Sequence, residues 1–129
     1  MRITIKSFWP AIIWLILSSV AFCLPGQALP KEDWFGIIQL DKWIHVGLFF
    51  VMVFFWCLPF FHKSAIQSSL TKLIIWITIG SFGYGILIEF IQHFFIPNRS
   101  FDAGDIAADA AGCLIGFFFV KRQQQIAAK

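Results

Sequence analysis

The stretch EFIQHFFIPNRSFDAGDIAADAAG, residues Glu89 to Gly112, places acids, amides and an arginine among phenylalanine and isoleucine. The whole chain of 129 residues is 59% hydrophobic and only 13% charged. A charged side chain in the middle of a bilayer costs about 3 kcal/mol or more unless it finds a partner or water. The polar residues of this stretch must therefore face one another or a wet cavity.

Four long apolar blocks contain or flank this stretch, at residues 8–24, 43–61, 70–96 and 103–120. The mean hydropathy of the chain is +0.79, which is too high for a water-soluble domain of this length. Each block is long enough to cross a hydrocarbon core of about 30 Å as a helix. Because no linker or repeat divides the chain, we expect one domain over residues 1–129. Its fold class is an all-α membrane protein, a bundle of four transmembrane helices.

The first block has a second interpretation, a cleaved signal peptide, because two cations precede it. However, GQALP (residues 26–30) lacks the usual cleavage pattern, and bulky Phe22 stands before Cys23 where a lipoprotein signal needs a small residue. We therefore expect this block to remain as a transmembrane helix. Cys23, Cys57 and Cys113 form no disulfide or metal-binding pattern, and we expect them to be small buried apolar side chains.

The distribution of Lys and Arg predicts the orientation of the bundle in the membrane. With the N-terminus inside, the outer segments hold three of the ten cations: Lys31, Lys42 and Arg99. The inner segments hold the other seven, which are Arg2, Lys6, Lys63, Lys72, Lys121, Arg122 and Lys129. We therefore expect both termini in the cytoplasm of a bacterium and a multi-pass protein of its cytoplasmic (inner) membrane. The net charge is +3, but the basic residues are scattered over short loops and form no patch, so we expect no binding to nucleic acid.

Three of the expected helices carry polar residues on one face near their outer ends, spaced by three or four positions. The third helix ends with such a set, and the second and fourth begin with one. These helices therefore bring polar side chains to one depth, where we expect one cluster in which Lys42, His45 and Arg99 face the acids. The predicted polar cluster comprises Asp41, Lys42, His45, Glu89, Gln92, Arg99, Ser100, Asp102, Asp105 and Asp109.

Helix ends explain part of this cluster without a binding role. Asp102 is placed to cap the N-terminus of the fourth helix, and Asp105 lies in the first turn, where the helix dipole favours a carboxylate. Asp109 lies too deep for that explanation, and Glu89 lies at the C-terminal end of its helix, where the dipole opposes its charge. We therefore predict that Glu89, at the centre of the cluster, pairs with Arg99 or His45 or keeps its proton.

Small residues recur every four positions in the fourth block, at Gly104, Ala108, Gly112 and Gly116. Such a ridge lets a neighbouring helix approach closely. A looser set in the third block, Gly80, Ser81, Gly83 and Gly85, is expected to pack in the same way.

Three motifs in this order resemble the VanZ-like family of small bacterial membrane proteins. They are DKWIH (residues 41–45), GYGILIEFIQ (83–92) and NRSFDAGDIAADAAGCLIG (98–116). One departure is Asp109, where the family pattern leads us to expect an asparagine. The resemblance implies an envelope protein of about four helices, and the namesake of the family is associated with low-level resistance to teicoplanin.

The residues and the resemblance leave three classes of function open. The first is a binding protein of the cell envelope whose outer site takes a lipid headgroup, a peptidoglycan precursor or a lipophilic glycopeptide antibiotic. The second is an intramembrane enzyme with a carboxylate and His45 as acid and base on a lipid-linked substrate. The third is a structural ion-pair core or a subunit of a complex. We expect membrane lipids as partners and no cofactor or metal, since no metal-binding spacing such as H-E-x-x-H supports a site at His45, Glu89, His93 and Asp109.

Overall fold

The computed structural model describes residues 4–25, 39–61 and 67–127, and all the regular structure in these ranges is helical. The short 3-10 helix η1 (Ile5–Phe8) leads into α1 (Trp9–Phe22), and α3 (Leu40–Cys57) continues into the 3-10 helix η3 (Leu58–Phe60). The helices α4 (Gln67–Phe95) and α5 (Ala103–Ala127) complete the bundle. The predicted all-α fold class is confirmed.

Four segments are long and apolar enough to cross a membrane: Ile5–Phe22, Leu40–Phe60, Ser69–Phe95 and Ala103–Ala127. These spans agree closely with three of the predicted blocks, whereas α5 runs on past residue 120. The helix continues through Lys121, Arg122 and three glutamines because these residues favour helix even where they end the apolar run.

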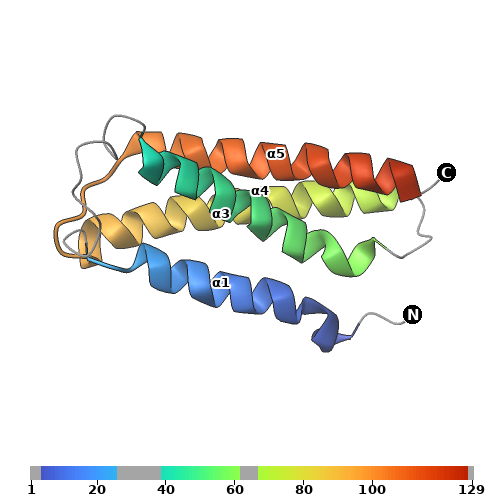
Figure 1. Cartoon of the computed structure of the whole chain (residues 1–129), viewed down its shortest axis with the longest axis horizontal. Coiled ribbons are helices and arrows are strands. Elements are labelled where there is room, and N and C mark those ends of the chain that lie inside the picture. Colours follow the sequence, from blue (N-terminus) through green and yellow to red (C-terminus); the bar gives the residue numbers. More distant parts are fainter. Residues whose placement is uncertain (1–3, 26–38, 62–66, 128–129) are drawn as a thin grey trace.

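The four helices alternate in direction, so that α1 begins and α5 ends at the same end of the bundle (Figure 1). The opposite end is formed by the ends of α1 and α4 and by the starts of α3 and α5 (Figure 1). We call it the acidic end, because Asp41, Asp102 and Asp105 lie there. The prediction that the termini are cytoplasmic is not tested by this arrangement.

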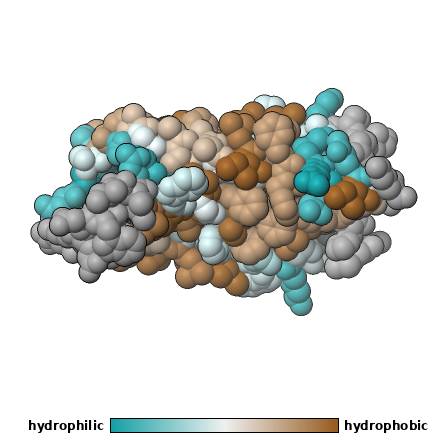
Figure 2. Space-filling model, turned by 45° about the horizontal axis from the view of Figure 1, so that its top comes forward, coloured by the Kyte–Doolittle hydropathy of each residue, from teal (hydrophilic) through white to brown (hydrophobic). Residues whose placement is uncertain are grey.

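The core runs along the bundle between α3, α4 and α5, with Phe49, Val53 and Cys113 among its fully buried side chains. Many large apolar residues point outward instead, such as Trp76 and Phe118, which are 70% and 66% exposed. Figure 2 shows apolar side chains mainly over the middle of the visible face and polar ones mainly towards its two ends. This banded surface fits a bundle whose middle contacts lipid chains.

The glycine ridge of α5 packs against α3, as predicted. A Cβ added at Gly112 would collide with the backbone oxygen of Val46, and one at Gly116 would lie 2.9 Å from the Cβ of Val53. Because the first obstacle is backbone, no rotamer change would make room for it. The small residues of α5 therefore bring the two helices close enough for their polar side chains to meet.

The looser set in α4 packs as predicted only in part, since Ser81 and Gly85 are buried and Gly80 and Gly83 are not. A Cβ at Gly80 or Gly83 would meet nothing within 4 Å, whereas one at Gly85 would lie 2.6 Å from Asp109 Oδ2. Only Gly85 of these three glycines is a close-approach position, since the other two face outward on the helix. The cysteines also divide: Cys57 and Cys113 are buried, but Cys23 is exposed at the end of α1, which corrects the expectation for that residue.

Candidate functional site

Two helix starts position the charged residues at the acidic end. Gln39 adopts a left-handed conformation with φ of 47° and turns the chain into α3, which places Asp41 and Lys42 in the first turn. Asp102 caps α5 as predicted, because its Oδ1 accepts a hydrogen bond of 2.6 Å from the backbone N–H of Gly104. The two starts lie side by side, so the first turns of α3 and α5 present their side chains to each other.

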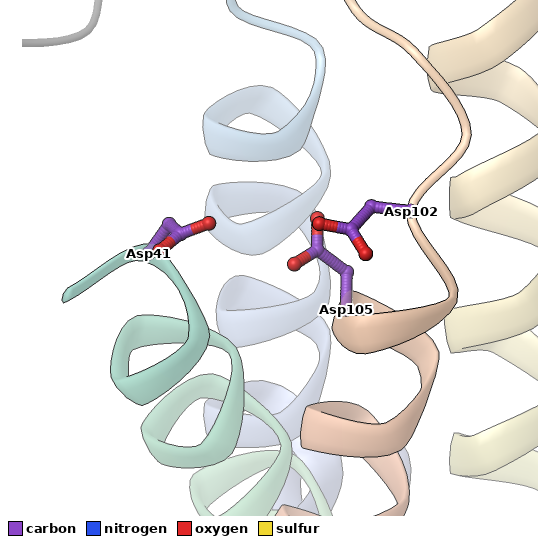
Figure 3. A group of neighbouring side chains, drawn as sticks. All are labelled: Asp41, Asp102 and Asp105. Atoms are coloured by element: carbon purple, nitrogen blue, oxygen red, sulfur yellow. The ribbon is translucent and has the colours of Figure 1, made fainter. Parts of the chain in front are cut away.

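Lys42 is the centre of the exposed part of the site. Its ammonium nitrogen Nζ lies 2.8 Å from Asp102 Oδ2, 3.0 Å from Asp105 Oδ1 and 3.7 Å from Asp41 Oδ2. Figure 3 shows the carboxylates of Asp102 and Asp105 next to each other, with Asp41 extending towards them from α3. The side chains of Asp41 and Asp102 are 55% and 47% exposed, so this ion-pair cluster opens to the surface at the end of the bundle.

The hydrogen bond from Lys42 lowers the pKa of Asp102 below its ordinary value of 3.8, and the bond from the Gly104 N–H acts in the same direction. Asp102 therefore carries its negative charge over the whole physiological pH range. This charge is held by one cation on α3 and by the positive end of α5.

Ligand oxygens of Asp41, Asp102 and Asp105 lie within 4.8 Å of one another, a spacing that also suits a metal ion. Here the Lys42 ammonium contacts all three carboxylates and already supplies the positive charge. The donor set does not fit a metal while this ammonium stands among the oxygens.

A buried pair, His45 and Asp109, lies one helical turn deeper in the bundle than the ion-pair cluster around Lys42. His45 Nδ1 is 2.7 Å from Asp109 Oδ1, and the two side chains are only 6% and 2% exposed. The other ring nitrogen, Nε2, points towards Asp105, whose Oδ2 is 3.8 Å away. Asp105 thus stands between the partly buried Lys42 and the buried His45, and it links the two levels of the site.

Glu89 does not pair with Arg99 or His45 in the part of the chain that the structure describes. Its Oε1 instead accepts a hydrogen bond of 2.5 Å from the backbone N–H of Asp102, and its side chain is buried. Glu89 therefore ties the end of α4 to the start of α5. A backbone donor thus stands where the sequence predicted Arg99 or His45, and the alternative that Glu89 keeps its proton stays a prediction.

Arg99 lies in the connection between α4 and α5, directly after a turn that ends at Asn98 with its left-handed φ of 59°. Among the described residues its guanidinium makes no ion pair, and its Nε is buried without a hydrogen-bond partner. Ser100 is exposed beside it, and His93 is exposed and contacts the rings of Phe94 and Phe101. Neither Ser100 nor His93 joins the ion pairs of the site.

Gln92 is buried, but it bonds away from the other polar residues. Its Nε2 donates to the backbone oxygen of Phe22 at 2.9 Å, so it caps the last turn of α1. A second link joins the same helices, since Ser19 Oγ and the Tyr84 hydroxyl lie 2.7 Å apart. The second contact was not foreseen, because nothing in the spacing of Ser19 relates it to α4.

Gly85 is a positional residue that the sequence pattern alone did not connect with the site. It lies one turn before Glu89 on the same face of α4, and a side chain there would run into Asp109. The four-residue spacing from Glu89 is the signal that could have identified it. Its lack of a side chain lets α4 approach the buried His45–Asp109 pair.

The fold and this site define a multi-pass α-helical membrane protein with an ionised cluster at one end of its bundle. Residues 5–124 match the VanZ/LLP1 family, and since this match covers nearly the whole chain, the protein belongs to that family. No curated protein and no solved structure gives a significant match to the chain.

Proposed function

We propose that this VanZ-family membrane protein binds the polar headgroup of an envelope amphiphile at the acidic end of its bundle. The observation that carries the proposal is the two-level site. The buried His45–Asp109 pair closes it from below, whereas the half-exposed carboxylates of Asp41 and Asp102 remain accessible from above. A site that served only to neutralise charge would have no need of exposed acids around a cation that is already paired.

The chemistry of the exposed residues defines the ligand. Carboxylates of Asp41 and Asp102 accept hydrogen bonds, so they fit hydroxyl or ammonium donors. The Arg99 guanidinium, which has no ion pair among the described residues, fits a phosphate or a carboxylate. A phospholipid headgroup, a lipid-linked peptidoglycan precursor and a glycopeptide of the teicoplanin type all combine such donors and anions with a hydrocarbon chain.

We propose that the acidic end lies on the outer side of the bacterial cytoplasmic membrane, because four of the six Lys and Arg residues in the described ranges lie towards the other end: Lys6, Lys72, Lys121 and Arg122. Labelling of an Asn98→Cys variant by a membrane-impermeant maleimide, in a Cys23→Ser background, tests this orientation. Labelling in intact spheroplasts is expected. Labelling only after the membrane is opened would reverse the orientation.

Binding is tested with short-chain ligands on the purified protein in detergent, so that the headgroup supplies most of the affinity. The probes are dihexanoyl phosphatidylethanolamine, dihexanoyl phosphatidylglycerol, a soluble muropeptide and teicoplanin. We expect Asp41→Asn and Arg99→Gln to weaken binding of the preferred probe about tenfold. Arg122→Gln removes an exposed cation at the opposite end and should leave binding unchanged. Equal affinity of all four proteins for every probe would rule out a headgroup site here.

A second candidate function, acid–base catalysis on a lipid-linked substrate, is favoured by one observation. Asp109 holds Nδ1 of His45 at 2.7 Å and thereby aims Nε2 at Asp105 and the exposed level of the site. His45→Gln distinguishes the two functions. The variant should still bind the headgroup in either case. If the protein is an enzyme, the parent releases a modified lipid and His45→Gln does not; if it only binds, neither protein releases one.

A further inference from the structure

A groove of about 330 Å³ lies between α1, α3 and α4, away from the ion-pair cluster. Its walls are Leu15 of α1, Met52 and Trp56 of α3, and the face of α4 from Ile77 to Tyr84. Leu15 and the α4 residues belong to the middle of their membrane spans, so the groove lies near the centre of the bilayer. It stays open because α1 touches α4 little, and because Gly80, which lines it, faces open space: a Cβ added there would meet nothing within 4 Å.

We infer that this groove holds the hydrocarbon chain of the amphiphile whose headgroup binds at the acidic end, an inference that rests on the proposed function. The depth of the groove in the bilayer leaves hydrocarbon as the surrounding medium. Tyr84 lies five residues before Glu89, or about 7.5 Å along α4. A lipid chain that descends from the acidic end therefore reaches the Tyr84 end of the groove within its own leaflet, which is about 15 Å deep, and the groove continues from there across the centre of the bilayer.

The size of the groove selects a chain over a helix. The α4 wall from Ile77 to Tyr84 is about 10 Å long, and a helix about 10 Å across would need on the order of 800 Å³ over that length. A hydrocarbon chain about 4 Å across needs on the order of 150 Å³. A groove of about 330 Å³ accommodates one or two chains and is too small for the full cross-section of a partner's transmembrane helix.

The walls also distinguish the groove from the ordinary lipid-facing surface. Elsewhere the bundle covers its outer faces with large side chains such as Leu114 and Phe118, which are 54% and 66% exposed. At the groove Gly80 takes that position and leaves room beside α1, whereas the equally outward-facing Gly83 lines no recess. The hydrogen bond between Ser19 and Tyr84 and the one from Trp14 to the Leu48 backbone oxygen hold α1 to its neighbours on either side of Leu15. The groove is thus a fixed recess rather than a gap that α1 closes.

Gly80 offers a direct test, because it lines the groove and a Cβ added there would meet nothing within 4 Å, so that a leucine extends into the groove. Gly83→Leu is the matched control, since Gly83 lies on the same helix, is equally free of neighbours and does not line the groove. The protein is placed in phosphatidylethanolamine–phosphatidylglycerol vesicles containing phosphatidylethanolamine with a diazirine at its chain end. After illumination, the labelled peptides are identified by mass spectrometry. A second series uses diacylglycerol with the same photoreactive chain and no charged headgroup.

We expect the label to concentrate on the peptides containing Met52 and Ile77–Tyr84. Labelling there should fall about tenfold in Gly80→Leu, because the leucine displaces chain methylenes, and should be unchanged in Gly83→Leu. Even labelling of all exposed faces, unaffected by Gly80→Leu, would overturn the inference. Crosslinking of the groove peptides to a second copy or to another protein in place of the lipid would overturn it too.

The two lipid series separate this inference from the headgroup proposal. If both are right, Arg99→Gln reduces labelling by phosphatidylethanolamine and leaves labelling by diacylglycerol unchanged. If Gly80→Leu blocks labelling by both lipids while Arg99→Gln affects neither, the chain groove stands and the headgroup site is wrong. Loss of the Arg99 effect and loss of the Gly80 effect are therefore distinct results.

Discussion

The interface between α3 and α5 and the interface between α1 and α4 are built on opposite principles. Along α3 and α5, Gly112 and Gly116 bring the backbones into contact, and ion pairs close the acidic end. Between α1 and α4, Gly80 leaves a recess, and two hydrogen bonds bridge the helices. The helices thus pack closely at the α3–α5 interface, where charged side chains must pair with one another. They pack loosely at the α1–α4 interface, where hydrocarbon can fill the remaining space.

The largest effect on stability is expected from forcing apart the tight interface between α3 and α5. Gly112→Leu should lower the free energy of unfolding by about 3 kcal/mol, the upper end of overpacking, because its Cβ meets the Val46 backbone oxygen. Gly83→Leu inserts the same side chain into open space on α4 and should change stability little. Thermal unfolding of both variants in detergent measures the difference. Equal melting temperatures would show that the two interfaces do not differ as described.

A smaller effect is expected from uncoupling the buried pair. His45→Ala and Asp109→Ala should each destabilise the fold, and the double variant should be less damaged than their sum. We expect a coupling energy of about 1–3 kcal/mol from equilibrium unfolding, because the two side chains are in contact at 2.7 Å.

The matched control is the cycle of Glu89→Gln and Arg99→Gln. These side chains form no ion pair in the structure, so their effects should add to within about 0.5 kcal/mol. A coupling as large as that of His45 and Asp109 would restore the pairing that the sequence suggested.

These two cycles mark how far the sequence leads. Apolar block length predicted the four helices, and the spacing of Asp105 and Asp109 predicted a polar face on α5. Periodicity reveals such a face but does not fix the rotation of one helix against another. For that reason Gly80 and Gly112 looked alike in the sequence, although one faces a recess and the other a backbone.

The choice of cation at the site was hidden for a related reason. Lys42 sits in the first turn of a helix and faces α5, whereas Arg99 follows a turn whose direction depends on the left-handed Asn98. Arg99 is close to the acids along the chain. However, the direction of its side chain depends on the backbone conformation of the turn, which residue spacing does not predict. The capping role of Asp102 could be predicted because it depends only on local sequence.

The smallest effect concerns the exposed level of the acidic end. Lys42 lowers the pKa of Asp102 below 3.8, so the folded protein holds this carboxylate ionised more strongly than the unfolded chain does. The resulting stabilisation is complete above the ordinary carboxyl pKa and disappears as the pH falls through the lower pKa of the folded state. Because 47% of the Asp102 side chain is exposed, water screens the pair and the effect should not exceed about 1 kcal/mol. Asp102→Asn should therefore lower the melting temperature slightly at pH 7 and reduce its decline on acidification below about pH 4. Asp41→Asn, which removes a weaker contact at 3.7 Å, should leave that acid limb almost unchanged. If Asp102→Asn and the parent lose stability in parallel as the pH falls, the ion pair at the acidic end contributes nothing to holding α3 and α5 together, and the tight interface rests on the buried level and the glycine ridge alone.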